Sequence, residues 1–376
     1  MNPYAHITGW GKYIPPTVLT NADLAELVDT SDQWIVEHTG IRERHIAVGE
    51  ETVVTMSAQA ARQALSVAGR TADDLDLIIV STSSPDRQLP GAAPMLQAAL
   101  GASRAAAFDL RSGCSGFLYA LAVARQFIAC GTYRCILVVG AEIVSRNTNW
   151  QDRRTCVLFG DGAGAVVVEA NEAPGGILHT AMGTQGKDYD ALTVKAGGSE
   201  YPMCAATYAR RWNTIELDGQ RTASFAVRTL LRQSTQAVTN AGLAWPDIEL
   251  FIPHQANLRL IELAAEKLGL SLERVFVNVD RYANLSAASV AVALCEAAEQ
   301  GRLHPGDHVL LVAFGAGLSW AAVVVQWGAA AAGSGPSRWR RFGQRLRQRF
   351  AGWLLGFRLA LYELARRRKG RKKAKR

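Results

Sequence analysis

Short apolar runs alternate with longer, alanine-rich segments along the first 327 residues of the chain. Three of the runs are apolar throughout, which predicts strands buried on both faces: residues 77–80, 135–139 and 309–313. Segments typical of helices lie between such runs, and the clearest are residues 55–69, 117–130 and 258–268. This alternation predicts an α/β protein in which helices cover the sheets.

The chain divides into two halves of similar layout. Residues 111–116 and residues 283–289 are rich in small side chains, and each segment opens an almost wholly apolar helix that is followed by Gly and a buried strand. A helix that is apolar on all sides must be buried, so two such helices predict a layered sandwich with both at its centre. Turn-forming residues near 172–176 separate the halves, which we place at residues 1–173 and 174–328.

The positive charge of the chain is concentrated at its C-terminal end. After a linker rich in Ala, Gly and Ser (residues 329–336), the tail of residues 337–376 holds 16 Lys and Arg and a single acid, Glu363. Residues 1–336 hold 25 bases and 32 acids and are therefore mildly acidic, so the net charge of +8 comes from the excess of basic residues in the tail. The body is therefore not expected to bind nucleic acid.

Composition excludes several classes of protein. With 376 residues, of which 49% are hydrophobic and 20% charged, the chain is neither disordered nor collagen-like. Its six Cys show no CxxC spacing, which argues against a disulfide framework and against a structural zinc site. The N-terminus lacks the pattern of a signal peptide, and no apolar run is long enough to span a bilayer. We therefore expect a cytoplasmic protein without a bound metal.

Cys114 is the first candidate for chemistry. It stands among small residues at the predicted N-terminus of a buried helix, where free N–H groups and the positive end of the helix dipole favour a thiolate over a thiol. A thiolate attacks thioesters and can carry an acyl group. The alternative is a small apolar side chain packed at the start of a helix, and the local residues leave both interpretations open.

His254 and Asn284 are the second and third candidates. His254 directly follows an apolar strand, where side chains face a cleft, and a neutral imidazole there could donate a hydrogen bond. It could equally do no more than cap the end of the strand. Asn284 lies just before an apolar helix, and considered alone it is interpreted as a helix N-cap.

Two glycine-rich segments receive different interpretations. Residues 315–317 follow a buried strand and could offer backbone N–H groups to a developing oxyanion. Residues 159–165 are superficially similar to a dinucleotide-binding loop, but strand-forming residues follow them where a phosphate loop requires a helix. We therefore interpret residues 159–165 as a tight turn that binds no nucleotide.

Longer motifs surround these candidates. They are residues 30–35 (TSDQWI), 39–44 (TGIRER), 159–164 (FGDGAG) and 253–257 (PHQAN). Together with Cys114, His254 and Asn284, they make the chain from Tyr4 to Trp327 resemble the β-ketoacyl-[acyl-carrier-protein] synthase III family of condensing enzymes. The resemblance implies a thiolase-like, five-layered αβαβα sandwich built from two similar halves, to which this chain adds a basic amphipathic tail.

The resemblance also implies a reaction. Cys114 takes an acyl group from acyl-coenzyme A, and malonyl carried on acyl carrier protein then enters. His254 and Asn284 polarise the malonyl thioester, so that decarboxylation gives a carbanion that attacks the acyl group on Cys114. The backbone N–H groups of Cys114 and Ala316 form the oxyanion hole. No cofactor is implied, and the product starts a fatty acid or a specialised polyketide, lipid or pigment chain.

Other residues acquire roles through the same resemblance. Trp34 and Arg153 match residues that hold the adenine of coenzyme A between them. Arg42 and Arg259 match basic residues at the mouth of the substrate tunnel, where Arg259 would help to dock acyl carrier protein. Leu89 matches a residue that closes the acyl pocket of the partner in a homodimer. Each Arg could instead be a solvated surface charge.

The chain departs from the family's pattern around the pocket. Ala283, Leu285 and Ala316 replace the usual Gly, Thr and Gly. Ala223 stands where larger residues are common at the tunnel mouth, and His38 stands where Arg is usual. None of these changes removes a catalytic group, but together they reshape the pocket and its entrance. The preferred primer therefore need not be acetyl-coenzyme A.

Two other functions remain open. An acyltransferase of the same fold would load Cys114 and pass the acyl group to another nucleophile, without decarboxylation and hence without a need for Asn284. A non-catalytic scaffold would use the fold and the tail to recruit carrier proteins to a membrane. A scaffold needs none of the three candidate residues, so their joint presence argues against it.

The tail predicts a basic amphipathic helix. Its aromatic and leucine residues recur at steps of three and four, Arg residues lie off that stripe, and nine of residues 366–376 are basic. Such a helix suits an anionic bilayer surface and could hold the protein at the inner face of the membrane. The alternatives are docking on the body or a partner subunit, a disordered tail, and binding of acyl carrier protein or nucleic acid.

Deleting residues 337–376 tests the membrane interpretation. We expect the truncated chain to keep its activity in solution and to lose binding to vesicles that contain anionic lipid, because the deleted segment holds 16 of the 41 basic residues. Cosedimentation measures the binding, with vesicles of neutral lipid as the control. Unchanged sedimentation of the truncated chain with anionic vesicles would exclude this interpretation.

Overall fold

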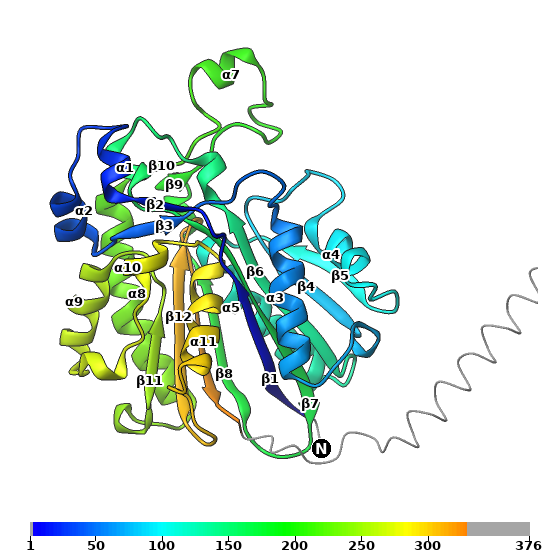
Figure 1. Cartoon of the computed structure of the whole chain (residues 1–376). Coiled ribbons are helices and arrows are strands. Elements are labelled where there is room, and N and C mark those ends of the chain that lie inside the picture. The colour runs from blue at the N-terminus through cyan, green and yellow to red at the C-terminus, as the bar shows by residue number, and fades with distance from the viewer. Residues whose placement is uncertain (1–2, 329–376) are drawn as a thin grey trace, which may run out of the picture. The chain divides into compact units, whose positions relative to one another are not determined.

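The computed structural model describes residues 3–328, and two sheets form its framework (Figure 1). The first sheet has five strands in the order β1-β7-β6-β4-β5. Their bounds are β1 Tyr4–Tyr13, β4 Leu77–Ser81, β5 Ala106–Leu110, β6 Cys135–Ile143 and β7 Asp161–Asn171. Strand β4 runs parallel to β5 and β6, whereas β7 runs antiparallel to β6 and β1.

The second sheet has four strands in the order β11-β12-β13-β8. Their bounds are β8 Gly176–Thr184, β11 Leu250–Pro253, β12 His308–Gly315 and β13 Ser319–Gln326. Only β11 and β12 are parallel, and the other neighbours are antiparallel. Two short ribbons pair β2 (Val18–Thr20) with β3 (Glu43–His45) and β9 (Leu192–Thr193) with β10 (Glu216–Leu217).

Helices lie between the two sheets and on both outer faces. Helices α5 (Gly116–Ala129) and α11 (Ala288–Glu299) pack against strands of both sheets. Helices α3 (Val53–Val67) and α4 (Ala92–Leu100) cover the outer face of the first sheet, and α8 (Gly219–Asn240) and α9 (Leu258–Leu268) lie outside the second. The short helices are α1 Asn21–Ala25, α2 Asp32–Thr39, α6 Arg153–Cys156, α7 Ala205–Ala209 and α10 Val279–Tyr282. The described residues therefore form alternating layers of helix and sheet.

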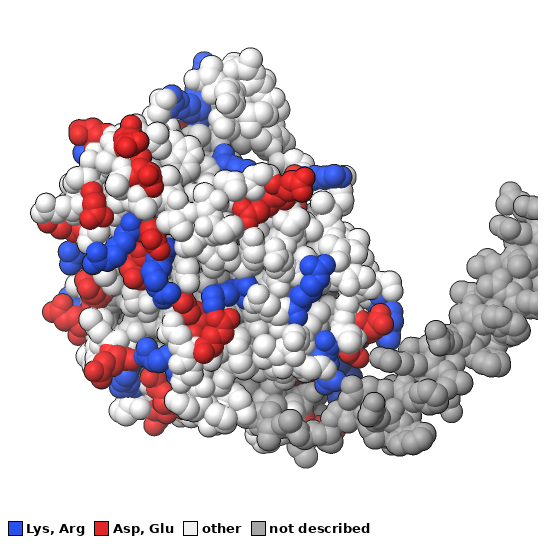
Figure 2. Space-filling model, viewed as in Figure 1, with Lys and Arg blue, Asp and Glu red and all other residues white. Residues whose placement is uncertain are grey.

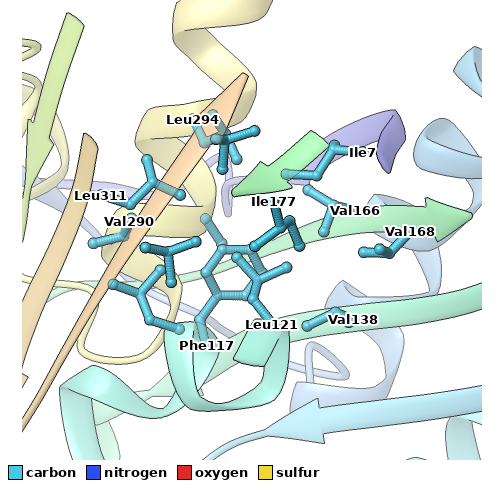
Figure 3. Close-up of a cluster of buried hydrophobic side chains, with 14 of the residues drawn as sticks. Ile7, Phe117, Leu121, Val138, Val166, Val168, Ile177, Val290, Leu294 and Leu311 are labelled. Atoms are coloured by element: carbon cyan, nitrogen blue, oxygen red, sulfur yellow. The ribbon is translucent and has the colours of Figure 1, made fainter. Parts of the chain in front are cut away.

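The apolar core has a large central part, between the two sheets, and outer parts between each sheet and the helices that cover it. The central part, drawn in Figure 3, places Phe117 and Leu121 of α5 with Val290 and Leu294 of α11, among side chains from both sheets. Two further clusters lie under the outer helices. Every residue of α11 from Ala288 to Ala297 is buried, as its apolar sequence predicts. The predicted central position of both apolar helices is thus confirmed.

Glycines allow α11 to lie directly against the first sheet. A Cβ on Gly164 of β7 would lie 2.6 Å from the Cβ of Ala291, and a Cβ on Gly140 of β6 would lie 2.4 Å from the carbonyl oxygen of Ala287. Real Cβ contacts are not this short, so larger residues would push the helix away. The interpretation of residues 159–165 as a tight turn is therefore wrong, because β7 begins at Asp161 and Gly164 within it lies against α11.

The other predicted elements lie close to their expected places. The strands expected at 77–80, 135–139 and 309–313 are β4, β6 and β12, and the helix expected at 258–268 is α9. The predicted boundary falls in the turn between β7 and β8, where the chain passes from one sheet to the other, and the division into halves at 173/174 remains a prediction. The linker (329–336) and the tail (337–376) lie outside the described residues. Within 3–328, no helix combines the length and hydrophobicity needed to cross a bilayer.

Substitution of Gly164 tests the close contact between α11 and the sheet. We expect Gly164→Ala to lower the free energy of unfolding by about 1–3 kcal/mol, the usual range for an overpacked core. Gly186→Ala is the matched control, because nothing lies within 4 Å of a Cβ at that position. Denaturant titration of both variants measures the effect. Equal stabilities would show that the glycine is not required by packing.

Candidate active site

Cys114 lies in a single turn of 3-10 helix, Gly113–Ser115, that leads into α5. Only 6% of its surface is exposed. The loop after β12 lies directly against it, since a Cβ on Gly315 would come within 3.0 Å of the Cys114 sulfur and 2.6 Å of its backbone nitrogen. The backbone N–H groups of Cys114 and Ala316 both act on the sulfur. The two donors expected to form an oxyanion hole therefore converge on the nucleophile.

Burial sets the protonation state of Cys114. It raises the pKa of the thiol to about 11, and the interactions with Ser286 and with the two backbone N–H groups only partly oppose this increase. The expectation that the helix N-terminus keeps the sulfur ionised is therefore wrong for the free protein. At neutral pH the group is a thiol, so its proton must leave as the sulfur attacks.

His254 follows β11 directly, where sequence analysis placed it. The side chain is 1% exposed and packs edge-on against Phe314, with ring centroids 5.1 Å apart. Burial lowers the pKa of the imidazole to about 3, so the ring is neutral at physiological pH. Nδ1 is buried without a hydrogen-bond partner. A proton there would be an orphaned donor, which favours the tautomer with its proton on Nε2.

Asn284 lies before α11, but it is not the N-cap of that helix, which is Ala287. Its Oδ1 accepts hydrogen bonds from the backbone N–H of Ser286 (2.8 Å) and the hydroxyl of Ser289 (3.4 Å). These bonds occupy the carbonyl end of the amide, so the NH₂ end is the group available for donation. The interpretation of Asn284 as a simple helix cap is corrected accordingly. Its neighbour Ala283, at φ +56° and ψ −157°, adopts a conformation that suits Gly.

The three candidates meet in one cavity. Cys114, His254 and Asn284 all line a cavity of about 250 Å³, together with the apolar side chains of Phe314 and Leu318. The cavity extends to Arg154, Ala223, Asn257 and Leu260. Ala223, one of the departures from the family's pattern, is therefore part of its wall. These residues are distant in sequence, and packing of the two sheets around α5 and α11 brings them together.

Cys114 also lines a second cavity, of about 220 Å³. Phe159 and Leu192 line both cavities as well, so the two cavities share these three residues in their walls. Apolar side chains from three segments, Val144, Val194 and Ile215, line part of the second cavity. Polar and charged side chains line another part of the wall, namely Ser83, Ser84, Arg111, Glu142, Asn147 and Ser286.

Sequence reasoning missed Glu142 and Ser286. Glu142 is 1% exposed and lies near the end of β6, a strand buried along its whole length. Ser286 is 8% exposed and donates a hydrogen bond of 3.1 Å to the Glu142 carboxylate. The available signal was a carboxylate within an otherwise apolar strand, since such a group is rarely buried without a partner.

Trp34 and Arg153 lie together, as the resemblance implies. The Arg153 guanidinium carbon is 4.7 Å from the centroid of the Trp34 ring, and Arg153 also donates a hydrogen bond to the carbonyl of Asp29. His38 stacks on Trp34 as well, at 4.3 Å between ring centroids. Because the cation rests on the ring itself, an adenine could enter between Trp34 and Arg153 only if they separated. Their role in binding coenzyme A remains a prediction.

The remaining predicted site residues line neither cavity. Arg259, at the start of α9, donates a hydrogen bond from Nε to the carbonyl of Glu37 and forms an ion pair with Glu262 at 3.5 Å. The side chain of Leu89 is 87% exposed. Arg42 is exposed as well. The roles of these three residues at the tunnel mouth and at a subunit interface stay predictions.

Charge and metal-ligating groups do not point to another kind of site. On the face shown in Figure 2, basic and acidic side chains are interspersed, without a continuous basic stripe. Within residues 3–328, no group of three or more His, Cys, Asp or Glu side chains is arranged to hold a metal ion.

Comparison with known proteins identifies similar chains. The family model described as 3-oxoacyl-[acyl-carrier-protein (ACP)] synthase III matches residues 108–186, and the model for its C-terminal part matches residues 238–327. The β-ketoacyl-[acyl-carrier-protein] synthase III of Roseiflexus sp. (strain RS-1) is 48% identical over 327 residues, covering 87% of this chain and 99% of that relative. The protein of the same name from Clostridioides difficile (strain 630) is 44% identical over 328 residues, covering 87% and 99%.

Solved structures give the same result. The 3-oxoacyl-[acyl-carrier-protein] synthase III from Aquifex aeolicus VF5 has a TM-score of 0.80 and 43% identity, covering 86% of this chain and 100% of that one. The priming β-ketosynthase from the R1128 polyketide biosynthetic pathway has a TM-score of 0.81 and 32% identity, covering 87% and 97%. The described residues therefore have the mixed α/β, thiolase-like fold that the sequence motifs imply.

The buried, neutral His254 predicts a dependence of stability on pH. Its pKa is lower in the folded than in the unfolded chain, so the unfolded chain binds an extra proton as the pH falls below about 6.5. We expect this group to remove about 1.4 kcal/mol of folding free energy per pH unit between pH 6 and pH 4. Denaturant titration of wild type and His254→Gln measures it. The variant should show a shallower slope, and identical slopes would contradict the assignment.

Proposed function

Because the chain belongs to the β-ketoacyl-[acyl-carrier-protein] synthase III family, we propose that Cys114, His254 and Asn284 carry out a decarboxylative condensation. An acyl group from acyl-coenzyme A is joined to malonyl on acyl carrier protein, which gives a β-ketoacyl product. One observation carries the assignment of residues. A buried thiol and two neutral hydrogen-bond donors, from separate parts of the chain, line one cavity.

The first step loads Cys114. Its sulfur attacks the thioester carbonyl of acyl-coenzyme A, a carbon–sulfur bond forms, and the thiol of coenzyme A leaves. Negative charge develops on the carbonyl oxygen during the attack. The backbone N–H groups of Cys114 and Ala316 already converge on the sulfur, which suits them to stabilise that oxygen. Because these donors are fixed before the substrate arrives, no reorganisation is needed during the reaction.

The second step uses His254 and Asn284. Loss of carbon dioxide from the malonyl group places negative charge on its thioester oxygen, and two donors stabilise it. Nε2–H of the neutral His254 and the amide NH₂ of Asn284 supply those donors. A neutral imidazole suits this task, because a donor without charge stabilises developing charge without attracting the malonyl carboxylate away from its productive position. The resulting carbanion attacks the acyl group and releases the Cys114 sulfur.

The two cavities suggest how the substrates divide. The first cavity, which reaches Arg154 and Asn257, accommodates the thioester arm of either substrate. The second, with Val144 and Ile215 in its wall, accommodates the acyl group on Cys114. Its volume of about 220 Å³ equals roughly seven water-sized volumes of about 30 Å³ each. A two-carbon acetyl group would not fill this space in the single chain. The partner's Leu89 would occupy part of it in the proposed homodimer, and the proposal of a longer primer applies to the space that remains.

The remaining contacts complete the proposal. Trp34 and Arg153 bind the adenine of coenzyme A, Arg42 and Arg259 lie where acyl carrier protein docks, and Leu89 completes the acyl pocket of the partner in a homodimer. The high exposure of Leu89 in the described chain is consistent with a covered position in such a dimer. A peripheral position of the protein at a membrane through residues 337–376 rests on the sequence alone.

An acyltransferase that transfers the acyl group without decarboxylation is the second candidate. It would also load Cys114, so loading does not separate the two functions. The hydrogen bonds of Asn284 separate the two functions, because two donors hold its carbonyl end and its NH₂ end is left to donate to a substrate oxygen. A transferase that forms no carbanion has no need of that donor. Condensation is therefore favoured.

Intact mass spectrometry tests both steps. Wild-type protein incubated with a panel of acyl-coenzyme A species should gain one acyl group, with the longer chains loading faster than acetyl, and should release carbon dioxide when malonyl carrier protein is added. Cys114→Ala should not acylate. Asn284→Ala should still acylate, but its condensation should fall by about 10²–10³-fold, as for other oxyanion donors.

Each alternative gives a different result in this assay. Acylation without release of carbon dioxide would support the acyltransferase. Absence of acylation from every member of the panel would contradict the proposed role of Cys114. Fastest loading by acetyl-coenzyme A would contradict the inference about chain length.

A further inference from the structure

Glu142 is a buried carboxyl group that the steps above do not use. Its two oxygens accept hydrogen bonds from the Ser84 hydroxyl (2.6 Å), the Ser83 N–H (3.1 Å), the Ser286 hydroxyl (3.1 Å) and the Thr82 hydroxyl (3.3 Å). Such a set of donors stabilises a carboxylate, whereas burial favours the neutral acid and raises the pKa. Glu142 is therefore placed to hold either a charge or a proton.

Ser286 connects Glu142 to the nucleophile. Its hydroxyl donates to the Glu142 carboxylate, which leaves the Ser286 oxygen as the acceptor for the Cys114 S–H group. Ser286 interacts with the Cys114 thiol and affects its pKa, and all three residues line the second cavity. Ser286 has a φ of +50°, a left-handed conformation that is costly for a residue other than Gly. Its N–H bond to Asn284 Oδ1 holds it there. This backbone conformation thus positions the hydroxyl for its bond to the Glu142 carboxylate.

The Cys114 proton needs an acceptor during acylation. Besides Cys114 itself, the titratable or charged groups that line the two cavities are Arg111, Arg154, His254 and Glu142. The two Arg are cations, and the pKa of His254 near 3 makes it a poor base. Glu142 is therefore the one carboxyl group among the described lining residues that can take the proton, and a serine hydroxyl lies on the way.

We propose that Ser286 and Glu142 form a proton relay for Cys114. As the sulfur attacks the acyl thioester, the thiol proton passes to the Ser286 oxygen while the Ser286 hydroxyl proton passes to the Glu142 carboxylate. When the bond between the acyl carbon and the coenzyme A sulfur breaks, the proton returns along the same path to the departing thiolate. No proton is gained or lost overall. The role in acylation rests on the proposed function.

The alternative is that Glu142 only anchors the segment 82–84 to the end of β6. Two substitutions separate these roles, since Thr82 and Ser286 each donate one side-chain hydrogen bond to the same carboxylate but only Ser286 contacts Cys114. An anchor is weakened at least as much by Thr82→Val as by Ser286→Ala, because the Thr82 hydroxyl also accepts a hydrogen bond from the Ser84 N–H. A relay is broken only by Ser286→Ala, or by Glu142→Gln, which keeps the shape of the side chain but not its basicity.

Electrostatics gives a further distinction. The negative charge of Glu142 raises the pKa of Cys114. If the carboxylate were no more than a nearby charge, Glu142→Gln would lower that pKa and make the sulfur more reactive. A relay predicts the opposite at neutral pH, because the thiol loses its base. Whether Cys114 becomes more or less reactive in Glu142→Gln therefore distinguishes a nearby charge from a relay.

Alkylation of Cys114 by iodoacetamide tests the relay without any acyl substrate. The full chain and its variants are alkylated at pH values from 7 to 10, and peptide mass spectrometry follows Cys114 separately from the exposed Cys130 and Cys204, which serve as internal references. At pH 7 we expect Cys114 to react at least tenfold more slowly in Glu142→Gln and Ser286→Ala than in wild type or Thr82→Val.

The pH profile distinguishes a lost base from a distorted site. Without the relay the sulfur must ionise before it reacts, so its rate should rise about tenfold per pH unit and approach the wild-type rate at high pH. A distorted site would be slower at every pH. Faster or unchanged alkylation in Glu142→Gln, or equal loss in Thr82→Val and Ser286→Ala, would overturn the relay. If Glu142→Gln fails to fold, the comparison of Thr82→Val with Ser286→Ala decides alone.

The result is independent of the condensing function. A chain that fails to condense acyl and malonyl thioesters but shows the expected alkylation profile would retain the relay and lose the proposed function. If the protein condenses them but Cys114 is alkylated at the same rate in wild type and in all three variants, the proposed function stands and the relay does not.

Discussion

The contact between α11 and the first sheet is the constraint on which the site depends. Gly140 of β6 and Gly164 of β7 have no side chains, so α11 approaches these strands closely at Ala287 and Ala291. That contact determines where the segment before the helix lies, and this segment carries Asn284 and Ser286. Helix α5, in the same central layer, begins at Gly116, two residues after Cys114. Two buried helices therefore bring the reacting groups together at their N-terminal ends.

Burial then determines the electrostatic character of the site. It raises the pKa of Cys114 and lowers that of His254, so the two groups are uncharged at neutral pH. An uncharged site costs less to desolvate than a thiolate–imidazolium pair would. Negative charge develops only during the reaction, and fixed backbone and side-chain donors then stabilise it. These donors stabilise negative charge but cannot accept the thiol proton of Cys114. The carboxylate of Glu142 can accept it.

The departures from the family's usual residues leave this framework intact and alter its surroundings. Ala316 still supplies its backbone N–H to the Cys114 sulfur, because that contact involves no side chain. Ala283 accepts a conformation that suits Gly, and its neighbour Asn284 remains in the cavity wall. Ala223 lines the cavity near its outer residues, and His38 stacks on Trp34. The changes are thus concentrated where substrates enter and bind, and the reacting groups are unchanged.

The sequence by itself determined the α/β class, the two central helices, the strands β4, β6 and β12, and the identity of Cys114, His254 and Asn284. These features follow from local hydrophobic patterns and from motifs that are contiguous in the chain. Only the tertiary structure decided the protonation of Cys114, the bonds of Asn284, the strand at residues 159–165 and the link between Ser286 and Glu142. Those two residues are 144 positions apart, and they meet because two layers pack against each other. The local hydrophobic pattern of the sequence indicates which residues are buried. Packing between distant elements determines which buried groups come into contact and what charge they carry.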